Sequence, residues 1–421
     1  MNEELLLPAG ARVLHIGPFK TGSTTLQAAF HQNRDALRRQ GVEYPAEGSN
    51  PMVAAMAVAG GRRLPGRSSL GLEHWQHVVE EVGAAGAHRT VVSSEFFCEA
   101  PEDSIATILE ELGGDRVHVV VTLRPLARIL PSQWQQYAQN QKVASYPEWL
   151  DAMLNHPDDT SLTPSFWRRH RHDQVVRRWA DVAGADHVTV IAVDQADRRM
   201  LLRTFEQLVG LEPETLVPPD VEANRSLTFP EVEMLREFNR RFGAHTWSSA
   251  DYTRLVRFGA ARHLQRRSPG PDEPRLLTPA WAVDAANEVA AEMVRGIRAS
   301  GVRVVGDLDA LVDAGPASAV GENLPRPDVP VEAAVRFSAG LVERLVSFPA
   351  WQAPQDRPAG PFEATMRSGG ESRALERQIL DEEAHNRSLV PLQALGSRVL
   401  LRELVGRLRR RLRRGTKEHH D

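Results

Sequence analysis

Cysteine is almost missing from this sequence: Cys98 is the single one among 421 residues. One thiol cannot form an internal disulfide, which excludes a disulfide-stapled secreted fold and favours a reducing compartment. Cys98 follows Phe96 and Phe97. A thiol in apolar surroundings is more often a buried structural group than a nucleophile.

Long apolar runs and a strong charge of one sign are missing too. Nowhere do about 18 apolar residues follow one another, so we expect no membrane-spanning helix. The start, MNEELLLPAG, is acidic and holds only three consecutive leucines, unlike a secretion signal, so we expect a cytoplasmic protein. The formal net charge is −4, which argues against a nucleic-acid-binding protein.

Short apolar segments alternate with helical patterns in the first 200 residues. Apolar, β-branched strands are expected at 12–17, 91–92, 117–123 and 188–193, and helical spacing of apolar residues begins at Thr25 and continues to Gly41. Near-continuous apolar strands between helices predict an α/β fold of the P-loop type, with a parallel sheet covered by helices on both faces. Ligands of such sheets bind at the carboxyl ends of the strands.

Composition divides the chain into three parts. Residues 1–313 form the expected sheet domain. Residues 314–398 are rich in Pro, Gly and Ala and read as a linker with one helix near Val331–Val346. Residues 399–421 are expected to form a basic amphipathic helix, since the stretch from Arg402 to Asp421 holds eight Lys/Arg against three Asp/Glu. A solvated tail is favoured; contact with an anionic membrane surface or an acidic partner is the alternative.

A glycine loop joins the first strand to the first helix. It reads GPFKTGSTT from Gly17 to Thr25. Such a turn exposes backbone N–H groups at a helix N-terminus, which together make an anion site. Lys20 adds a full positive charge, and Ser23, Thr24 and Thr25 add hydroxyl donors.

The loop differs from the Walker A pattern, G-x-x-x-x-G-K-[ST]. Gly17 and Gly22 have the required separation and Thr24 occupies the Ser/Thr position. However, Ser23 stands at the lysine position, and Lys20 lies before the second glycine. An ordinary ATPase or GTPase would therefore lack the lysine that bridges its phosphates.

Residues 18–27, PFKTGSTTLQ, resemble the phosphosulfate loop of sulfotransferases that use 3′-phosphoadenosine 5′-phosphosulfate (PAPS). That loop has the form P-K-[ST]-G-[ST]-[ST], matched here apart from the inserted Phe19. Bacterial members with G-P-H-K-T-G-T-T are most similar, and Phe19 stands where they have histidine. The resemblance covers about residues 11–311 and implies a PAPS-dependent sulfotransferase.

A second element of the resemblance follows the strand 117–123. In that family a strand, an arginine and a serine eight residues later hold the 3′-phosphate of the donor, and Arg124 and Ser132 have this separation. Arginine offers a charged fork that matches phosphate oxygens. The resemblance thus implies a donor site formed by Lys20, Thr21, Gly22, Ser23, Thr24, Thr25, Arg124 and Ser132.

Sulfuryl transfer needs charge stabilisation at the leaving phosphate and a base for the acceptor. We expect Lys20 to serve the leaving group and Glu95, at the end of the strand 91–92, to be the base. His170 and His172 are the competing bases. No metal site is expected.

Two other functions stay open: a kinase on a P-loop fold that uses Mg-ATP, and a nucleotide-binding scaffold without catalysis. The acceptor is a hydroxyl or amine of an unidentified small molecule or carbohydrate. Trp134, Trp149 and Trp167 favour a sugar or glycolipid, although each could instead be a core aromatic.

Overall fold

The computed structural model describes residues 5–45, 48–60, 69–159, 161–194, 196–218, 225–242, 249–312 and 320–347. Six strands form one sheet in the order β2-β3-β1-β4-β5-β6, and every pairing is parallel. The predicted α/β fold with a parallel sheet is therefore confirmed. The strands are β1 (Arg12–His15), β2 (Val42–Glu43), β3 (Arg89–Ser93), β4 (Val117–Leu123), β5 (Val188–Ala192) and β6 (Arg303–Val305).

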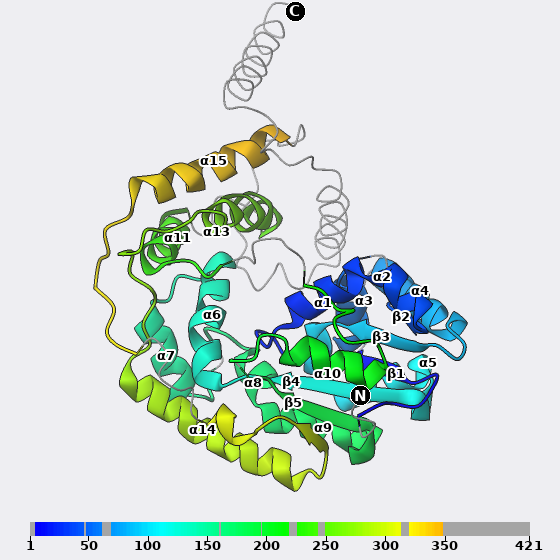
Figure 1. The fold of residues 1–421 in the computed structure, drawn as a ribbon. Coiled ribbons are helices and arrows are strands. Elements are labelled where there is room, and N and C mark those ends of the chain that lie inside the picture. The colour runs from blue at the N-terminus through cyan, green and yellow to red at the C-terminus, as the bar shows by residue number, and fades with distance from the viewer. Residues whose placement is uncertain are drawn as a thin grey trace, which may run out of the picture. The chain divides into compact units, whose positions relative to one another are not determined.

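Helices connect these strands and build a second, all-helical layer beside the sheet (Figure 1). Short 3₁₀ turns also occur at η1 (Glu95–Glu99), η2 (Gly114–Arg116), η3 (Ala185–His187) and η5 (Asp309–Leu311), and η4 (Thr253–Ala261) is a π-helix. The α-helices are α1 (Ser23–Gln32), α2 (Arg34–Arg39), α3 (Met52–Ala59), α4 (Ser69–Ala84), α5 (Glu102–Leu112), α6 (Leu126–Gln139), α7 (Tyr146–Leu154), α8 (Phe166–His170), α9 (His172–Ala183), α10 (Met200–Val209), α11 (Phe229–Phe242), α12 (Ser249–Tyr252), α13 (Arg262–Gln265), α14 (Ala280–Ala299) and α15 (Val331–Ser347).

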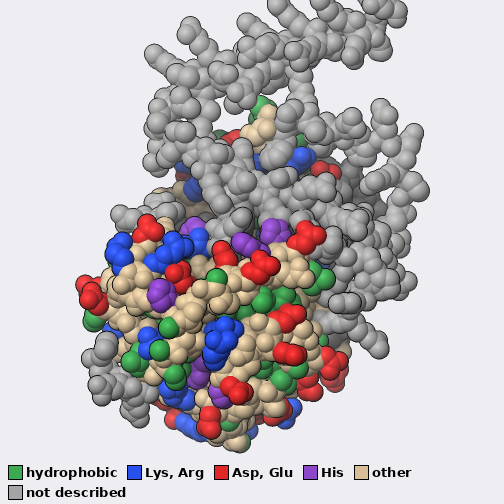
Figure 2. All heavy atoms as spheres, turned by 90° about the vertical axis from the view of Figure 1, so that its right-hand side faces the viewer, with side chains coloured by type: hydrophobic (Ala, Val, Ile, Leu, Met, Phe, Trp, Pro, Cys, Tyr) green, Lys and Arg blue, Asp and Glu red, His purple; other side chains and the backbone are tan. Residues whose placement is uncertain are grey.

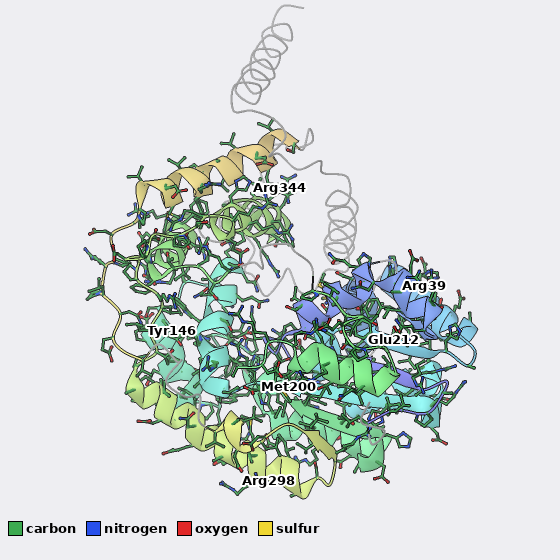
Figure 3. All side chains as sticks on the ribbon, in the orientation of Figure 1. Arg39, Tyr146, Met200, Glu212, Arg298 and Arg344 are labelled. Carbon is green, nitrogen blue, oxygen red and sulfur yellow. The ribbon has the colours of Figure 1, made fainter. Side chains whose placement is uncertain are left out.

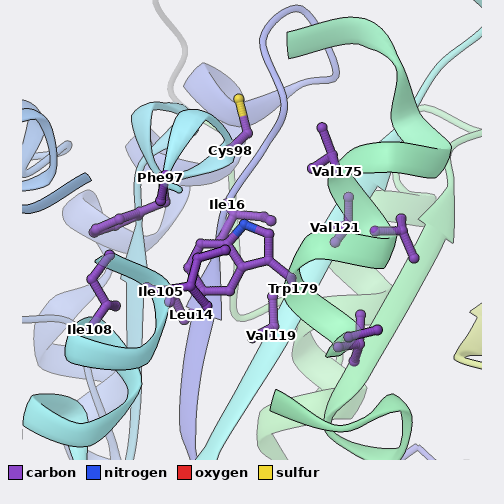
Figure 4. Packing of buried hydrophobic residues seen from close by; sticks show 14 of the residues in the cluster. Leu14, Ile16, Phe97, Cys98, Ile105, Ile108, Val119, Val121, Val175 and Trp179 are labelled. Carbon is purple, nitrogen blue, oxygen red and sulfur yellow. The ribbon is translucent and has the colours of Figure 1, made fainter. Parts of the chain in front are cut away.

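Alternate residues of each strand enter two separate cores, because successive side chains of a strand point to opposite faces. On one face Leu14, Val119 and Val121 pack with α5 and α9, where Trp179 is completely buried (Figure 4). On the other face the neighbouring strand residues pack with α1 and α10. This two-sided burial explains why the strands are nearly continuous apolar runs.

The helical layer has a core of its own, formed by α6, α7, α11, η4, α14 and α15. Trp134 and Trp149 lie in this core and are 2% and 1% exposed, and Trp167 packs against it. These tryptophans are therefore core aromatic residues. The hypothesis that they form a face for a sugar is wrong for Trp134 and Trp149. Tyr146 of α7, labelled in Figure 3, stacks on Trp149 with 6.2 Å between ring centroids.

Helix α15 falls inside the stretch interpreted as a linker, at the expected position. It packs closely on η4, where a Cβ on Gly340 would come within 2.8 Å of the Gly259 carbonyl oxygen, so both positions depend on glycine for backbone approach. Arg344 of α15 (Figure 3) donates to the Phe258 carbonyl at 3.2 and 3.1 Å. The domain boundary expected at 313 and the basic helix at 399–421 lie outside the described residues and stay predictions, as does any partner of that helix.

The single helix expected from Thr25 to Gly41 is divided in the structure. Helix α1 begins at Ser23 and ends at Gln32, and α2 begins at Arg34. Between them, Asn33 turns its side-chain amide back onto the Ala29 carbonyl at 2.7 Å. An asparagine that bonds the backbone in this way competes with helix continuation, which accounts for the break.

The described surface is mixed in charge. Figure 2 shows one face on which Lys and Arg side chains lie among Asp and Glu side chains. Within the described part of the chain, no helix combines the length and the apolar composition needed to cross a membrane.

A buried ion network fixes the start of α11. Arg225 makes two bonds to Glu231, at 2.8 and 2.7 Å, and Arg267 donates to Glu231 at 2.9 Å. The side chains of Glu231 and Arg267 are 0% and 1% exposed. Burial alone would raise the pKa of Glu231, but hydrogen bonds from Arg225, the Thr228 amide and Arg267 outweigh it and hold this pKa below its usual value.

We therefore expect Glu231→Gln to lower the free energy of unfolding by about 3–5 kcal/mol, because the buried Arg267 and the partly buried Arg225 lose the carboxylate that they share. Glu237→Gln on the same helix is the control, since Glu237 is 44% exposed and pairs with Arg240 and Arg241 at the surface. The control should cost less than about 1 kcal/mol. Urea unfolding measures both variants, and equal losses would contradict this account.

Candidate active site

The glycine loop lies where the sequence predicts it, between the carboxyl end of β1 and the N-terminus of α1. No side chain caps α1, and its first turn holds no acidic residue. The amides of Ser23, Thr24 and Thr25 therefore have no helical partner and carry the positive end of the helix dipole. Thr24 and Thr25 are exposed there, whereas the buried Ser23 hydroxyl makes no hydrogen bond.

Lys20 has a left-handed backbone, with φ of 69°. This conformation costs a non-glycine residue about 1–2 kcal/mol, and such residues gather at functional sites. The fold holds it through the neighbouring Phe19, which is 5% exposed. Phe96 packs edge-on against the Phe19 ring at 5.1 Å, and the Arg169 guanidinium covers the ring at 4.3 Å. The inserted loop residue is thus an anchor for the lysine beside it.

Thr21 makes its side-chain contacts inside the protein. Its hydroxyl donates to the Pro18 carbonyl at 2.7 Å and lies 2.7 Å from the Thr122 hydroxyl. It is 2% exposed. The Thr21 hydroxyl is therefore engaged inside the protein, and the role of Thr21 at a donor stays a prediction.

Glu95 lies directly against the glycine loop. A Cβ on Gly17, which has φ of 79°, would come within 2.9 Å of the Glu95 Cβ, so this close approach requires glycine. Gln27 and Asn50 both donate to the Oε2 of Glu95 at 3.1 Å. These two amides fix the orientation of the carboxylate.

Positive charges converge around Lys20. Burial, Arg257 and Arg124 lower the pKa of Lys20 and Glu95 raises it, and together they bring this pKa to about 8. Burial and Arg128 lower the pKa of Arg124, whose buried Nε makes no hydrogen bond. Clustered cations with a single carboxylate nearby are a site for an anion of several charges.

Arg257 was not identified from the sequence. It lies in the π-helix η4, about 130 residues beyond Arg124, within the run TRLVRFGAA. Nothing in that run distinguishes it from an arginine at the surface. A π-helix is rare and is frequently found at functional sites, but it shows only in the structure.

Ser132, the second residue expected at the 3′-phosphate, lies on α6 and is half-buried. Its hydroxyl donates to the Ile129 carbonyl at 2.9 Å, one turn earlier in the helix. The hydroxyl can still accept a hydrogen bond, but its proton is directed at the helix backbone. Its role at a phosphate stays a prediction.

His170 and His172 are 0% and 2% exposed. Burial, together with His172, Arg169 and Lys20, lowers the pKa of His170 well below its usual value. Burial lowers that of His172 to about 4. Both ring nitrogens of His170 lack a hydrogen bond. His170 is thus a neutral imidazole in the field of Lys20, whereas the charge that acts on His172 is that of Asp173.

Two more polar groups lie buried on α6. They are both amide atoms of Gln133, which is 0% exposed, and the hydroxyl of Tyr137, one turn later. Burial raises the pKa of Tyr137, and Arg169 and hydrogen bonds with Gln133 and Ser165 oppose this shift. Arg169 therefore lies near the Tyr137 hydroxyl.

Metal ligands do not gather in the described ranges: no group of three or more His, Cys, Asp or Glu is placed to hold an ion. The fold and the loop together define the class of protein as a parallel α/β protein whose strand–loop–helix turn ends at an uncapped helix N-terminus.

Comparisons with known proteins add one structural likeness. No family model matches the chain, and no curated protein matches it. A crystal structure of a sulfotransferase from Alicyclobacillus acidocaldarius aligns with 16% identity over 55% of this chain and 92% of that chain, at a TM-score of 0.36. A likeness at this level defines neither fold nor activity.

The lowered pKa of Lys20 predicts that the affinity for 3′-phosphoadenosine 5′-phosphate (PAP, the desulfated donor) depends on pH. The resemblance described above implies that the ammonium form attracts the 5′-phosphate, and this form is lost as pH rises through about 8. Above that pH, the dissociation constant should rise about tenfold per pH unit.

Calorimetric titration from pH 7.5 to 9.5 measures this dependence. Lys20→Arg is the matched control, since it keeps the charge and removes the titration. The pH step should vanish in this variant. A step of the same size in Lys20→Arg would assign it to another group.

Proposed function

We propose that the protein transfers a sulfuryl group from PAPS to a hydroxyl or amine of an acceptor. The observation that carries the proposal is the convergence of Lys20, Arg124 and Arg257 at the uncapped N-terminus of α1. A lysine placed before the second glycine suits a phosphosulfate better than a Mg²⁺-bound triphosphate. The unpaired Arg124 Nε and Ser23 hydroxyl are donors that phosphate oxygens would satisfy.

In the reaction, the acceptor oxygen forms a bond to sulfur while the bond between sulfur and the 5′-phosphate oxygen breaks. The amides of residues 23–25 hold the 5′-phosphate, and Lys20 stabilises the charge that develops on the leaving oxygen. Arg124 and Arg257 bind the remaining phosphate charge. Glu95 takes the proton of the acceptor, since amides hold its Oε2 and the carboxylate lies against the loop.

We assign the acceptor to the side of the loop marked by Phe19, Tyr137 and His170. The buried groups there, an amide, a phenol and a neutral imidazole, can both donate and accept, as hydroxyl groups do. The cation among them, Arg169, is already paired with Glu99 at 2.7 Å. This balance favours a neutral, hydroxyl-rich acceptor over an anionic one.

Binding of PAP tests the donor. Calorimetry should show binding that needs the 3′-phosphate and ignores Mg²⁺, and Arg124→Ala should weaken it about tenfold or more, as for a lost charge-assisted bond. Arg128→Ala is the control on the next turn. Preference for Mg-ATP would replace the proposal with the kinase reading.

Release of PAP from PAPS tests catalysis. Neutral polyols (trehalose, N-acetylglucosamine) should raise the rate of PAP release above the rate with water alone. They should raise it more than the anionic glucuronate does. Glu95→Gln should lower the stimulated rate about 10²–10⁴-fold while PAP binding survives. Near-normal rates in this variant would remove Glu95 as base and promote His170. PAP binding without stimulated turnover by any of these would favour a non-catalytic scaffold.

A further inference from the structure

A buried imidazole connects the ends of three neighbouring strands. His15, the last residue of β1, is 0% exposed. Its Nδ1 lies 2.7 Å from the Ser93 hydroxyl, at the end of β3, and its Nε2 lies 3.0 Å from the Thr122 hydroxyl, near the end of β4. These strands flank β1 in the sheet. Phe205 holds the ring edge-on, with 5.4 Å between centroids.

The connection continues into the glycine loop. The Thr122 hydroxyl lies 2.7 Å from that of Thr21, which in turn donates to the Pro18 carbonyl at 2.7 Å. The Thr122 amide donates to the Gly17 carbonyl, also at 2.7 Å. The loop that carries Lys20 is thus bonded to β4 and, through Thr122, to His15.

Counting protons gives these bonds a direction. Thr21 has one hydroxyl proton, and the Pro18 carbonyl, which can only accept, takes it. The 2.7 Å contact between the threonines then needs the proton of Thr122, and the Gly17 carbonyl, 3.2 Å from the Thr122 hydroxyl, can accept only this same proton. Thr122 has none left for His15, so Nε2 of His15 is the donor and carries the ring proton.

The other ring nitrogen follows from the same count. Burial lowers the pKa of His15 to about 3, so the ring is neutral and carries a single proton. With that proton on Nε2, Nδ1 accepts from the Ser93 hydroxyl. The ordered chain is Ser93 to His15 to Thr122 to Thr21 to Pro18.

We propose that His15 is a positioning residue that sets the distances among Glu95, Lys20 and Arg124 through this ordered chain. Glu95 follows Ser93 by two residues, and Arg124 follows Thr122 by two. One ring bonded to both strand ends and, through Thr122, to the loop therefore fixes all three groups at once. The effect of His15 on donor binding rests on the proposed function. The tautomer of the His15 ring can be measured whether or not that function is correct.

Paired substitutions test the positioning role. The amide nitrogen of Gln reaches the place of Nε2, while Asn reaches only that of Nδ1. His15→Gln should keep the PAP dissociation constant within about threefold of the parent, because the donor to Thr122 is retained. His15→Asn and His15→Leu should weaken PAP binding about tenfold or more, because the bond to Thr122 is lost.

Circular dichroism and thermal unfolding establish that each variant is folded. Equal PAP affinity in the Asn and Gln variants, or parent-like affinity in the Leu variant, would overturn the proposal. Thr122→Val cuts the chain at the next bond and should weaken binding as His15→Asn does. Added to His15→Asn, it should produce little further loss, since the two changes break one path. Full additivity would contradict a single path.

Nitrogen-15 NMR of the parent protein provides a readout independent of PAP. His15 should show a protonated Nε2 and an unprotonated Nδ1, unchanged from pH 5 to pH 9. A protonated Nδ1 or a charged ring in that range would refute the ordered chain. If the parent protein bound no PAP, the proposed function would fail while this measurement still decided the state of His15.

Discussion

The site depends on one constraint: the strand ends β3, β1 and β4 must stay in register where they leave the sheet. Backbone pairing sets their spacing as far as His15, Ser93 and Val120. Beyond that point backbone bonds continue from Ser94 to His15, from Ile16 to Val120 and from Thr122 to Gly17. The imidazole of His15 adds side-chain bonds to both neighbouring strands. Each strand then delivers one functional group, so a small shift at this ring would move all of them.

Near these strand ends the protein holds several positive charges close together, an arrangement that a bound anion would stabilise. Lys20 keeps a left-handed backbone and a pKa lowered to about 8 beside Arg257 and Arg124. Like charges held together in a partly buried place repel one another, and an anion bound among them lowers this free-energy cost. The packing of Phe19 between Phe96 and Arg169 supplies the rigidity that such a site requires.

The helical layer contributes to the site through η4. Its core holds the π-helix in place, and the close contact of Gly340 with Gly259 lets α15 cover it. Arg257 reaches the field of Lys20 from this layer. A region that composition marked as a linker is thus, at α15, part of the support for a site built mainly by the sheet.

The sequence by itself determined the parallel sheet, the loop and the candidate groups on it, because apolar runs and glycine–lysine spacing are local properties of the chain. Only the tertiary structure decided which of them meet. In the structure Arg257 acts on Lys20, and the Thr21 hydroxyl bonds inside the protein. His15, a polar residue in an apolar strand, lies at the centre of a hydrogen-bond chain. Contacts between residues about 80 to 240 positions apart follow from strand order and helix packing, which no short pattern encodes.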